Sequence, residues 1–298
     1  MARKSIAGWL VVPLMLAGTS YANALSVNAV TAGADAALLA QASLAANSGI
    51  TIVGGSETYT GADDQGGTFS DFSLSNSTTN ISIQDGVVLT SGDATGIVVS
   101  DNTDTSFDAD LQAPGDPGLD TLIGTTNDAN VLSFEFTVDP GITSVSANFV
   151  FGTEEFPDQS FTDIFAVFVD GQNFAEFSDG TLISFQDGMP SEAFFNDNDV
   201  DILDPFSDGD GNEFQYDGIT DVLTVTGLLD QSLTTHTISI AIADTLDFIF
   251  DSGVFFAGLT AGTETDGGIT PPTPVPLPAT IWLMIAAFCA FGVFKRRV

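Results

Sequence analysis

Every lysine and arginine of this 298-residue chain lies in one of its two end segments. The five are Arg3, Lys4, Lys295, Arg296 and Arg297, whereas all 40 acidic residues lie between these ends. The long segment between them can therefore form no ion pair with a lysine or arginine of its own. Each carboxylate must be solvated, hydrogen-bonded to backbone or hydroxyl donors, or neutralised by a cation. The same lack of basic groups excludes nucleic acid and anionic membrane surfaces as partners.

The N-terminus has the three parts of a secretory signal peptide. Arg3 and Lys4 precede an apolar run from Ile6 to Ala17, and Ala22-Asn23-Ala24 forms a small-x-small cleavage site. The sequence therefore predicts a signal peptide over residues 1–24, cut after Ala24 by a signal peptidase once the secretion machinery has engaged it. An uncleaved N-terminal anchor is the alternative, for which the apolar run is short.

The segment between the ends has the pattern of an all-β domain. Short runs of Val, Ile, Phe and Thr alternate with Gly, Asp and Asn clusters, and one helix is expected from Asp35 to Asn47. The predicted strands are Thr51–Val53, Thr68–Phe72, Ile81–Ile83, Val87–Thr90, Val131–Val138, Ser144–Phe151, Ile164–Val169, Thr181–Phe185, Val222–Thr226, Thr235–Ala243 and Gly253–Leu259. Short strands without helices between them predict a jelly-roll-like antiparallel β-sandwich over residues 25–260. A Gly/Thr/Pro-rich stalk is expected over residues 261–274.

The last two dozen residues combine a proline motif, an apolar run and a basic end. The motif is Val275, Pro276, Leu277, Pro278 and Ala279, followed by the apolar residues 280–294 and by Lys295, Arg296 and Arg297. A helix over 280–294 spans about 22 Å, less than the roughly 30 Å of a hydrocarbon core. The basic triplet should stay in the cytoplasm and halt export with the domain outside. An ordinary single-pass transmembrane anchor is the alternative.

This tail resembles the PEP-CTERM sorting signal in its VPLPA variant. The resemblance implies processing near the motif by an exosortase, a polytopic membrane enzyme of Gram-negative bacteria that make extracellular polysaccharide. The protein would then be held by the inner membrane transiently, before it becomes linked to the cell surface or released among extracellular polysaccharide.

The segment between the ends also carries a series of motifs in a fixed order. They are Thr58–Ala62, Gly86–Gly92, Pro114–Asp116, Phe149–Pro157, Asp163–Gly171, Tyr216–Thr220, Ile240–Asp244 and Asp251–Phe256. Together they resemble the choice-of-anchor L domain over roughly residues 36–260. That family is named for its pairing with different surface-anchoring signals, so the resemblance implies a surface-protein domain and no particular activity.

Two acidic groups are candidates for Ca²⁺, which prefers six to eight oxygen ligands. The first lies in the acidic loop Phe195–Asp217: Asp197, Asp199, Asp201, Asp204, Asp208, Asp210 and Glu213. Neither Asp197-x-Asp199-x-Asp201 nor Asp208-x-Asp210-x-Asn212 is followed by the glycine that an EF-hand loop needs. The second group lies within the family-like motifs: Glu154, Glu155, Asp163, Asp244, Asp247 and Asp251. The alternative is that these residues cap backbone amides in turns, as aspartate often does.

The sequence offers little for catalysis. His236, the one histidine, is expected to share a buried strand face with Ile238 and Ile240, and no Gly-x-Ser-x-Gly elbow accompanies it. Glu154 and Glu155 would point to opposite faces of a strand, which disfavours a facing glycosidase pair. The leading hypothesis is a non-enzymatic exported surface or matrix protein. The alternatives are a Ca²⁺-dependent carbohydrate-binding or adhesin-type module and an envelope hydrolase.

Overall fold

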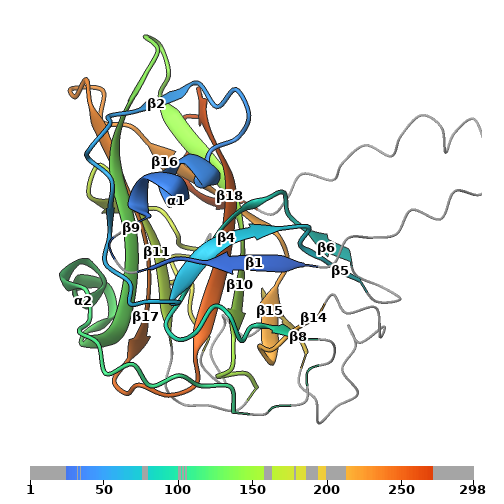
Figure 1. Cartoon of the computed structure of the whole chain (residues 1–298). Coiled ribbons are helices and arrows are strands. Elements are labelled where there is room, and N and C mark those ends of the chain that lie inside the picture. The colour runs from blue at the N-terminus through green and yellow to red at the C-terminus, as the bar shows by residue number, and fades with distance from the viewer. Residues whose placement is uncertain are drawn as a thin grey trace, which may run out of the picture.

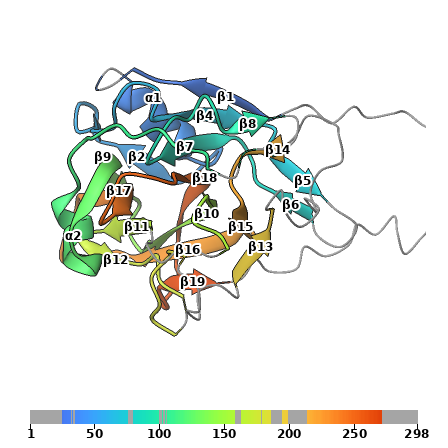
Figure 2. The same ribbon diagram turned by 90° about the horizontal axis from the view of Figure 1, so that it is seen from below.

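The computed structural model of the chain describes residues 25–270 apart from 32, 34, 76–79, 100, 101, 103, 105, 158–162, 178, 186–193 and 199–212. These residues form two antiparallel sheets packed face to face (Figures 1 and 2). The predicted signal peptide 1–24, the motif 275–279, the apolar run 280–294 and the basic end lie outside the described residues. No helix in the described part of the chain has the length and apolar character needed to span a membrane.

One sheet has nine strands and the other has six. In the first, the order is β1 (Ser26–Ala29), β4 (Gly66–Ser70), β7 (Gly86–Thr90), β18 (Ser252–Gly262), β10 (Ser144–Thr153), β15 (Gly218–Thr220) and β13 (Phe195–Asp197), with β16 (Leu223–Leu228) beside β10 and β19 (Gly268–Thr270) beside β16. In the second, the order is β12 (Gln172–Asn173), β11 (Ile164–Val169), β17 (His236–Thr245), β9 (Thr126–Val138) and β2 (Ile50–Ile52), with β3 (Thr58–Tyr59) also on β9. Two small ladders join β5 (Ser73–Ser75) to β6 (Asn80–Ser82) and β8 (Val98–Val99) to β14 (Glu213–Phe214).

Phenylalanine fills the space between the two sheets. Alternate residues of each long strand face this core, so that Phe134 and Phe136 of β9 meet Phe149 and Phe165 from β10 and β11. All four are at most 1% exposed, and the rings of Phe149 and Phe165 lie 5.0 Å apart. This phenylalanine-rich core is the largest apolar cluster of the described residues.

A second apolar cluster lies on the outer face of the nine-stranded sheet. Phe69, Phe72 and Phe255 pack there with ring centroids 4.5 to 6.2 Å apart. β7 therefore has core on both of its faces, which explains the unbroken apolar run Val87–Leu89.

The sandwich is confirmed, but several local predictions were wrong. A second helix, α2 (Pro117–Ile123), lies where the sequence predicted no helix. Asp116 caps it by accepting hydrogen bonds from the amides of Gly118 and Leu119. The first helix, α1 (Ala36–Ser43), is shorter than expected, and Asp35 precedes it without a capping side-chain bond.

The predicted stalk was also wrong over most of its length. β18 continues to Gly262, and β19 pairs with β16 through Ile269 opposite Val225. Ile269 is 8% exposed and belongs to the main core. The folded sheet therefore extends to Thr270, and of the predicted stalk only 271–274 lies outside the described residues. The predicted strand Thr181–Phe185 forms isolated bridges in place of a ladder.

Candidate cation-binding site

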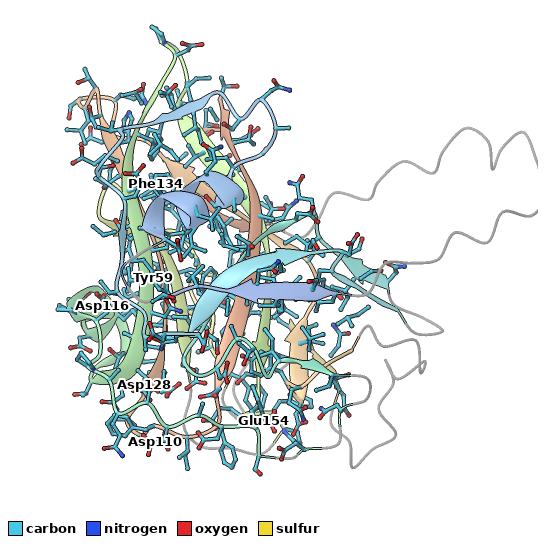
Figure 3. All side chains as sticks on the ribbon, in the orientation of Figure 1. Tyr59, Asp110, Asp116, Asp128, Phe134 and Glu154 are labelled. Carbon is cyan, nitrogen blue, oxygen red and sulfur yellow. The ribbon has the colours of Figure 1, made fainter. Side chains whose placement is uncertain are left out.

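The second group of predicted acidic residues lies at one end of the sandwich. Glu154 and Glu155 follow β10, Asp163 precedes β11, Asp244 is near the end of β17, and Asp247 and Asp251 lie between β17 and β18. The chain crosses between the sheets at this end twice, from β10 to β11 and from β17 to β18. Figure 3 shows Glu154 at this lower end, and the segment from β8 to α2 runs along the same edge in Figure 1. We call these six residues the acidic end.

The strand register places like charges opposite each other in both sheets. Ile164 pairs with Ala243, so the next pair along is Asp163 with Asp244. Thr153 pairs with Ser252, so the next pair is Glu154 with Asp251, and the Glu154 amide donates to the Asp251 carbonyl at 3.0 Å. Like charges directly opposite each other destabilise a sheet. Each sheet therefore ends in an acidic pair that needs compensation.

Five of the six carboxylates are almost fully buried. Glu154, Glu155, Asp163, Asp244 and Asp251 are 0 to 3% exposed, and Asp247 is half-buried at the edge of the group. Within the described part of the chain, no donor forms a hydrogen bond to either carboxylate oxygen of Glu155 or Asp244. Buried charges without partners are costly, so this arrangement requires protons or a cation.

Glu154 and Asp163 each have an identifiable donor, whereas Asp251, like Glu155 and Asp244, has no hydrogen-bond donor on either carboxylate oxygen among the described residues. The Ser252 hydroxyl lies 2.5 Å from Asp163 Oδ2, and the Phe107 amide donates to Glu154 Oε1 at 2.8 Å. The Ser252 contact links the nine-stranded sheet to the six-stranded sheet. Gly92 lies against Asp251, because a Cβ built on Gly92 would be 1.7 Å from Asp251 Oδ2. The acidic end is thus closely packed, and a glycine makes room for one of its carboxylates.

Burial, together with repulsion from neighbouring carboxylates inside or outside the group, raises the pKa of every carboxyl in the acidic end. Burial, followed by the charges of Asp247, Asp244 and Glu154, raises the pKa of Glu155 to about 9. Burial, followed by Asp217, raises the pKa of Glu154 to about 9. Near neutral pH the carboxyls therefore retain protons unless a cation takes their place.

The same causes act on the aspartates of the acidic end. Burial and neighbouring aspartates raise the pKa of Asp251 to about 8. Burial is also the main cause that raises the pKa values of Asp163, Asp244 and Asp247. The Ser91 hydroxyl lies near Asp244, without the geometry of a hydrogen bond, and partly offsets the effect there.

The chemistry of the acidic end suits a hard cation. It offers carboxylate and hydroxyl oxygens, and the one histidine lies elsewhere. As the described side chains lie, no three His, Cys, Asp or Glu residues already enclose a metal ion. The first candidate group is not assembled by the described residues: Asp197 lies on β13 and Glu213 on β14, and 199–212 lie outside them.

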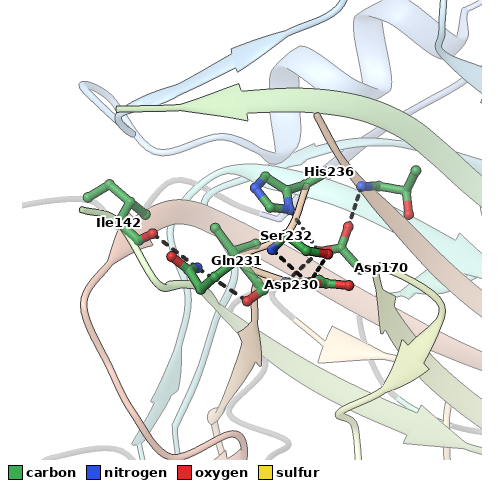
Figure 4. Close-up of polar contacts among 8 residues, drawn as sticks. Ile142, Asp170, Asp230, Gln231, Ser232 and His236 are labelled. Carbon is green, nitrogen blue, oxygen red and sulfur yellow. Dashed lines mark hydrogen bonds and ion pairs between the residues drawn. The ribbon is translucent and has the colours of Figure 1, made fainter. Parts of the chain in front are cut away.

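His236 lies at the opposite end of β17 and has a structural partner. Its Nδ1 is 2.7 Å from Asp170 Oδ2, and Asp170 also accepts from the amides of Thr237 and Asp230, each at 2.9 Å (Figure 4). The imidazole is 4% exposed and shares its buried face with Ile238 and Ile240. The prediction of a strand histidine held by the fold is confirmed.

Asp170 was not recognised from the sequence, although a signal was present. Asp170 and Gly171 both have positive φ, 50° and 82°, in the tight turn between β11 and β12. An Asp-Gly pair after an apolar strand is typical of such hairpin turns. The nearby Ser232 hydroxyl donates to Asp230 at 2.7 Å and is not hydrogen-bonded to His236, so these residues form no Ser-His-Asp relay.

Two packed antiparallel sheets, a phenylalanine core and an acidic end without basic residues define an all-β sandwich domain. The chain belongs to the choice-of-anchor L domain family, whose model matches residues 27–260. No curated protein and no solved structure matches the chain. Membership of this family makes the protein a cell-surface or extracellular protein.

Proposed function

We propose that the chain is a non-enzymatic surface or matrix protein that an exosortase sorts through its C-terminal tail. The proposal rests on one observation: the folded domain and the apolar and basic end segments occupy separate parts of the chain. Both sheets and the apolar cores of the described domain lie between Leu25 and Thr270, whereas every lysine and arginine lies beyond these limits. Val275 follows Thr270 by five positions, so the sorting motif begins close to the end of the domain.

The position of β19 suits removal of the tail. β19 is the last strand of the described chain and pairs with β16 at the edge of the nine-stranded sheet. A cut near Val275–Ala279 would leave that pairing in place, so the released domain would keep its fold. The signal peptide would bring the domain across the membrane, and residues 280–297 would hold it there until the cut.

The geometry of the polar residues supports a role without catalysis. His236 is committed to Asp170, and the carboxylates of the acidic end are buried instead of flanking an open cleft. A glycosidase pair needs room between its two carboxyls for a sugar and, in inverting enzymes, for a water. A Ca²⁺-dependent carbohydrate-binding or adhesin-type module is the second candidate, and the acidic end is the observation that favours it.

The sorting proposal is tested in a host that carries an exosortase. A variant with Val275–Ala279 scrambled is compared with the natural chain and with a control in which residues 271–274 are reordered. The intact mass and the location of the protein are measured for each. The natural chain and the control should lose their tails and reach the surface or medium, whereas the scrambled variant should keep its tail in the inner membrane. An unchanged mass and location of the scrambled variant would contradict the proposal.

A further inference from the structure

We infer that Glu155, Asp163, Asp244 and Asp247 bind a Ca²⁺ ion that holds the two sheets together at the acidic end. This site is independent of the sorting proposal, because it lies wholly within the described domain. We call these four residues the inner carboxylates. They come from the turn after β10, the start of β11, the end of β17 and the loop after it.

The inner carboxylates are close enough to act on one another. Asp163 and Asp244 are opposite each other in the extended register of β11 and β17. The charges of Asp247 and Asp244 act on Glu155, and those of Glu155 and Asp247 act on Asp163. Ser252 of β18 reaches Asp163 from the other sheet. One ion among them would therefore contact elements of both sheets.

Unpartnered oxygens within this group indicate a ligand. Glu155 is 1% exposed and Asp244 is 0% exposed, and neither has a hydrogen-bond partner on either oxygen among the described residues. The inward Oδ1 of Asp247 has none either. No lysine or arginine is within the domain, and His236 is bound to Asp170 at the far end of β17. A cation from solution would satisfy the group without any basic side chain.

The loop after β17 has an unusual backbone conformation. Leu246 and Phe250 have φ values of 74° and 66°, a region that bulky residues rarely adopt. Leu246 is 66% exposed, so burial of its side chain does not explain its conformation. The charge of Asp247 in this loop acts on Glu155 and Asp163, and the Asp247 backbone carbonyl accepts from the Asn127 side-chain amide at 2.7 Å. Backbone strain of this kind is concentrated at binding sites.

Calcium fits this group better than magnesium does. Ca²⁺ accepts six to eight oxygens in irregular geometry, whereas Mg²⁺ requires a near-ideal octahedron at 2.0–2.1 Å. No three of the described carboxylates already enclose an ion, so the ligands must adjust when it binds. Glu155 and Asp247 lie in a turn and a loop and can move toward Asp163 and Asp244 at the strand ends. The site therefore requires an ion that accepts irregular coordination geometry.

The test measures the melting temperature of the exported protein, with its tail, purified in detergent. The natural chain is scanned in EDTA, in millimolar CaCl₂ and in millimolar MgCl₂. At about 100 times its Kd, Ca²⁺ should raise Tm by roughly 5–10 °C for a domain of this size. Mg²⁺ should raise it much less. No rise in CaCl₂, or an equal rise in MgCl₂, would overturn the proposal.

Charge-removing variants separate binding from a merely structural role. Asp244→Asn should raise Tm in EDTA above pH 7, because the amide is neutral and needs no proton when it is buried, and should abolish the calcium-dependent rise. Glu155→Gln should do the same and carries the test if Asp244→Asn does not fold. Glu135→Gln, an exposed change on β9, is the control and should keep the full calcium response. Retention of the calcium response in both Asp244→Asn and Glu155→Gln would refute the site.

Discussion

Without divalent cations, this domain should become less stable as the pH rises from 5.5 to 7.5. Glu155 shows why: its ordinary pKa is 4.5, and burial with its acidic neighbours raises the pKa to about 9 in the folded protein. Between these values the folded state keeps a proton that the unfolded chain releases. The free energy of unfolding then falls by about 1.4 kcal/mol per pH unit for each retained proton.

The size of this effect follows from the number of protons retained. One retained proton costs about 3 kcal/mol of stability between pH 5.5 and 7.5, which lowers Tm by roughly 6–12 °C. Glu154 and Asp251, with pKa values raised to about 9 and about 8, add to it in the same direction. Asp179 and Asp230 have pKa values lowered from 3.8, so both are ionised in the folded and unfolded states across this range and do not change the slope.

The assay is urea unfolding in EDTA at several pH values, repeated in high salt. Repulsion within a chain of net charge −35 also grows with pH, but salt screens exposed charges far more than buried ones. The slope that survives high salt therefore reports the acidic end. In saturating calcium the stability should instead rise with pH, because the ion competes with the protons for the same oxygens. If the stability in EDTA and high salt stays constant or rises with pH, the folded protein does not hold the buried carboxyls in their protonated form.

Three further substitutions have defined effects on unfolding free energy, measured by urea titration. Gly92→Ala should cost about 3 kcal/mol or more, because its Cβ would be 1.7 Å from Asp251 Oδ2; a neutral result would show that Asp251 is not held there. Asp170→Asn should cost about 1–2 kcal/mol, because one acceptor oxygen for His236 and its neighbouring amides is lost, and should leave the calcium response unchanged. Phe134→Ala should cost about 3–5 kcal/mol as a cavity in the core, again with calcium binding retained.

The long strands were predictable because their patterns are local. Ile164–Val169 was predicted with its observed bounds, and β9 extends the predicted Val131–Val138. The pairing of strands was not predictable in this way, since it joins distant segments. Ser91 contacts Ser252 across 161 positions of sequence, and no local pattern carries that information. α2 was missed because Pro117 and Gly118 resemble a turn, although Asp116 before Pro117 is also a helix start signal.

The residues of the acidic end could be selected from the sequence by their charge, but their pairing could not be predicted. Six acidic residues were singled out because they lay in family-like motifs without basic partners. The structure brings all six to one end of the sandwich, five of them buried. The like-charge pairs Asp163–Asp244 and Glu154–Asp251 could not be foreseen, because they depend on the register of two separate sheets. Burial of such pairs is a consequence of the fold and not of any one segment.

The proposed calcium site and the predicted export signals have a common physical rationale. A chain that crosses the membrane before it folds benefits from a native state that is weak inside the cell and strong outside. Extracellular calcium modules bind with Kd values of about 10⁻⁴–10⁻³ M, so they fill only where calcium is abundant. If Glu155 and Asp244 need that ion, the sheets close fully only after export. The same requirement explains a domain without lysine or arginine: an internal cation beside Asp163 or Asp244 would satisfy the carboxylates in every compartment, and the dependence on location would be lost.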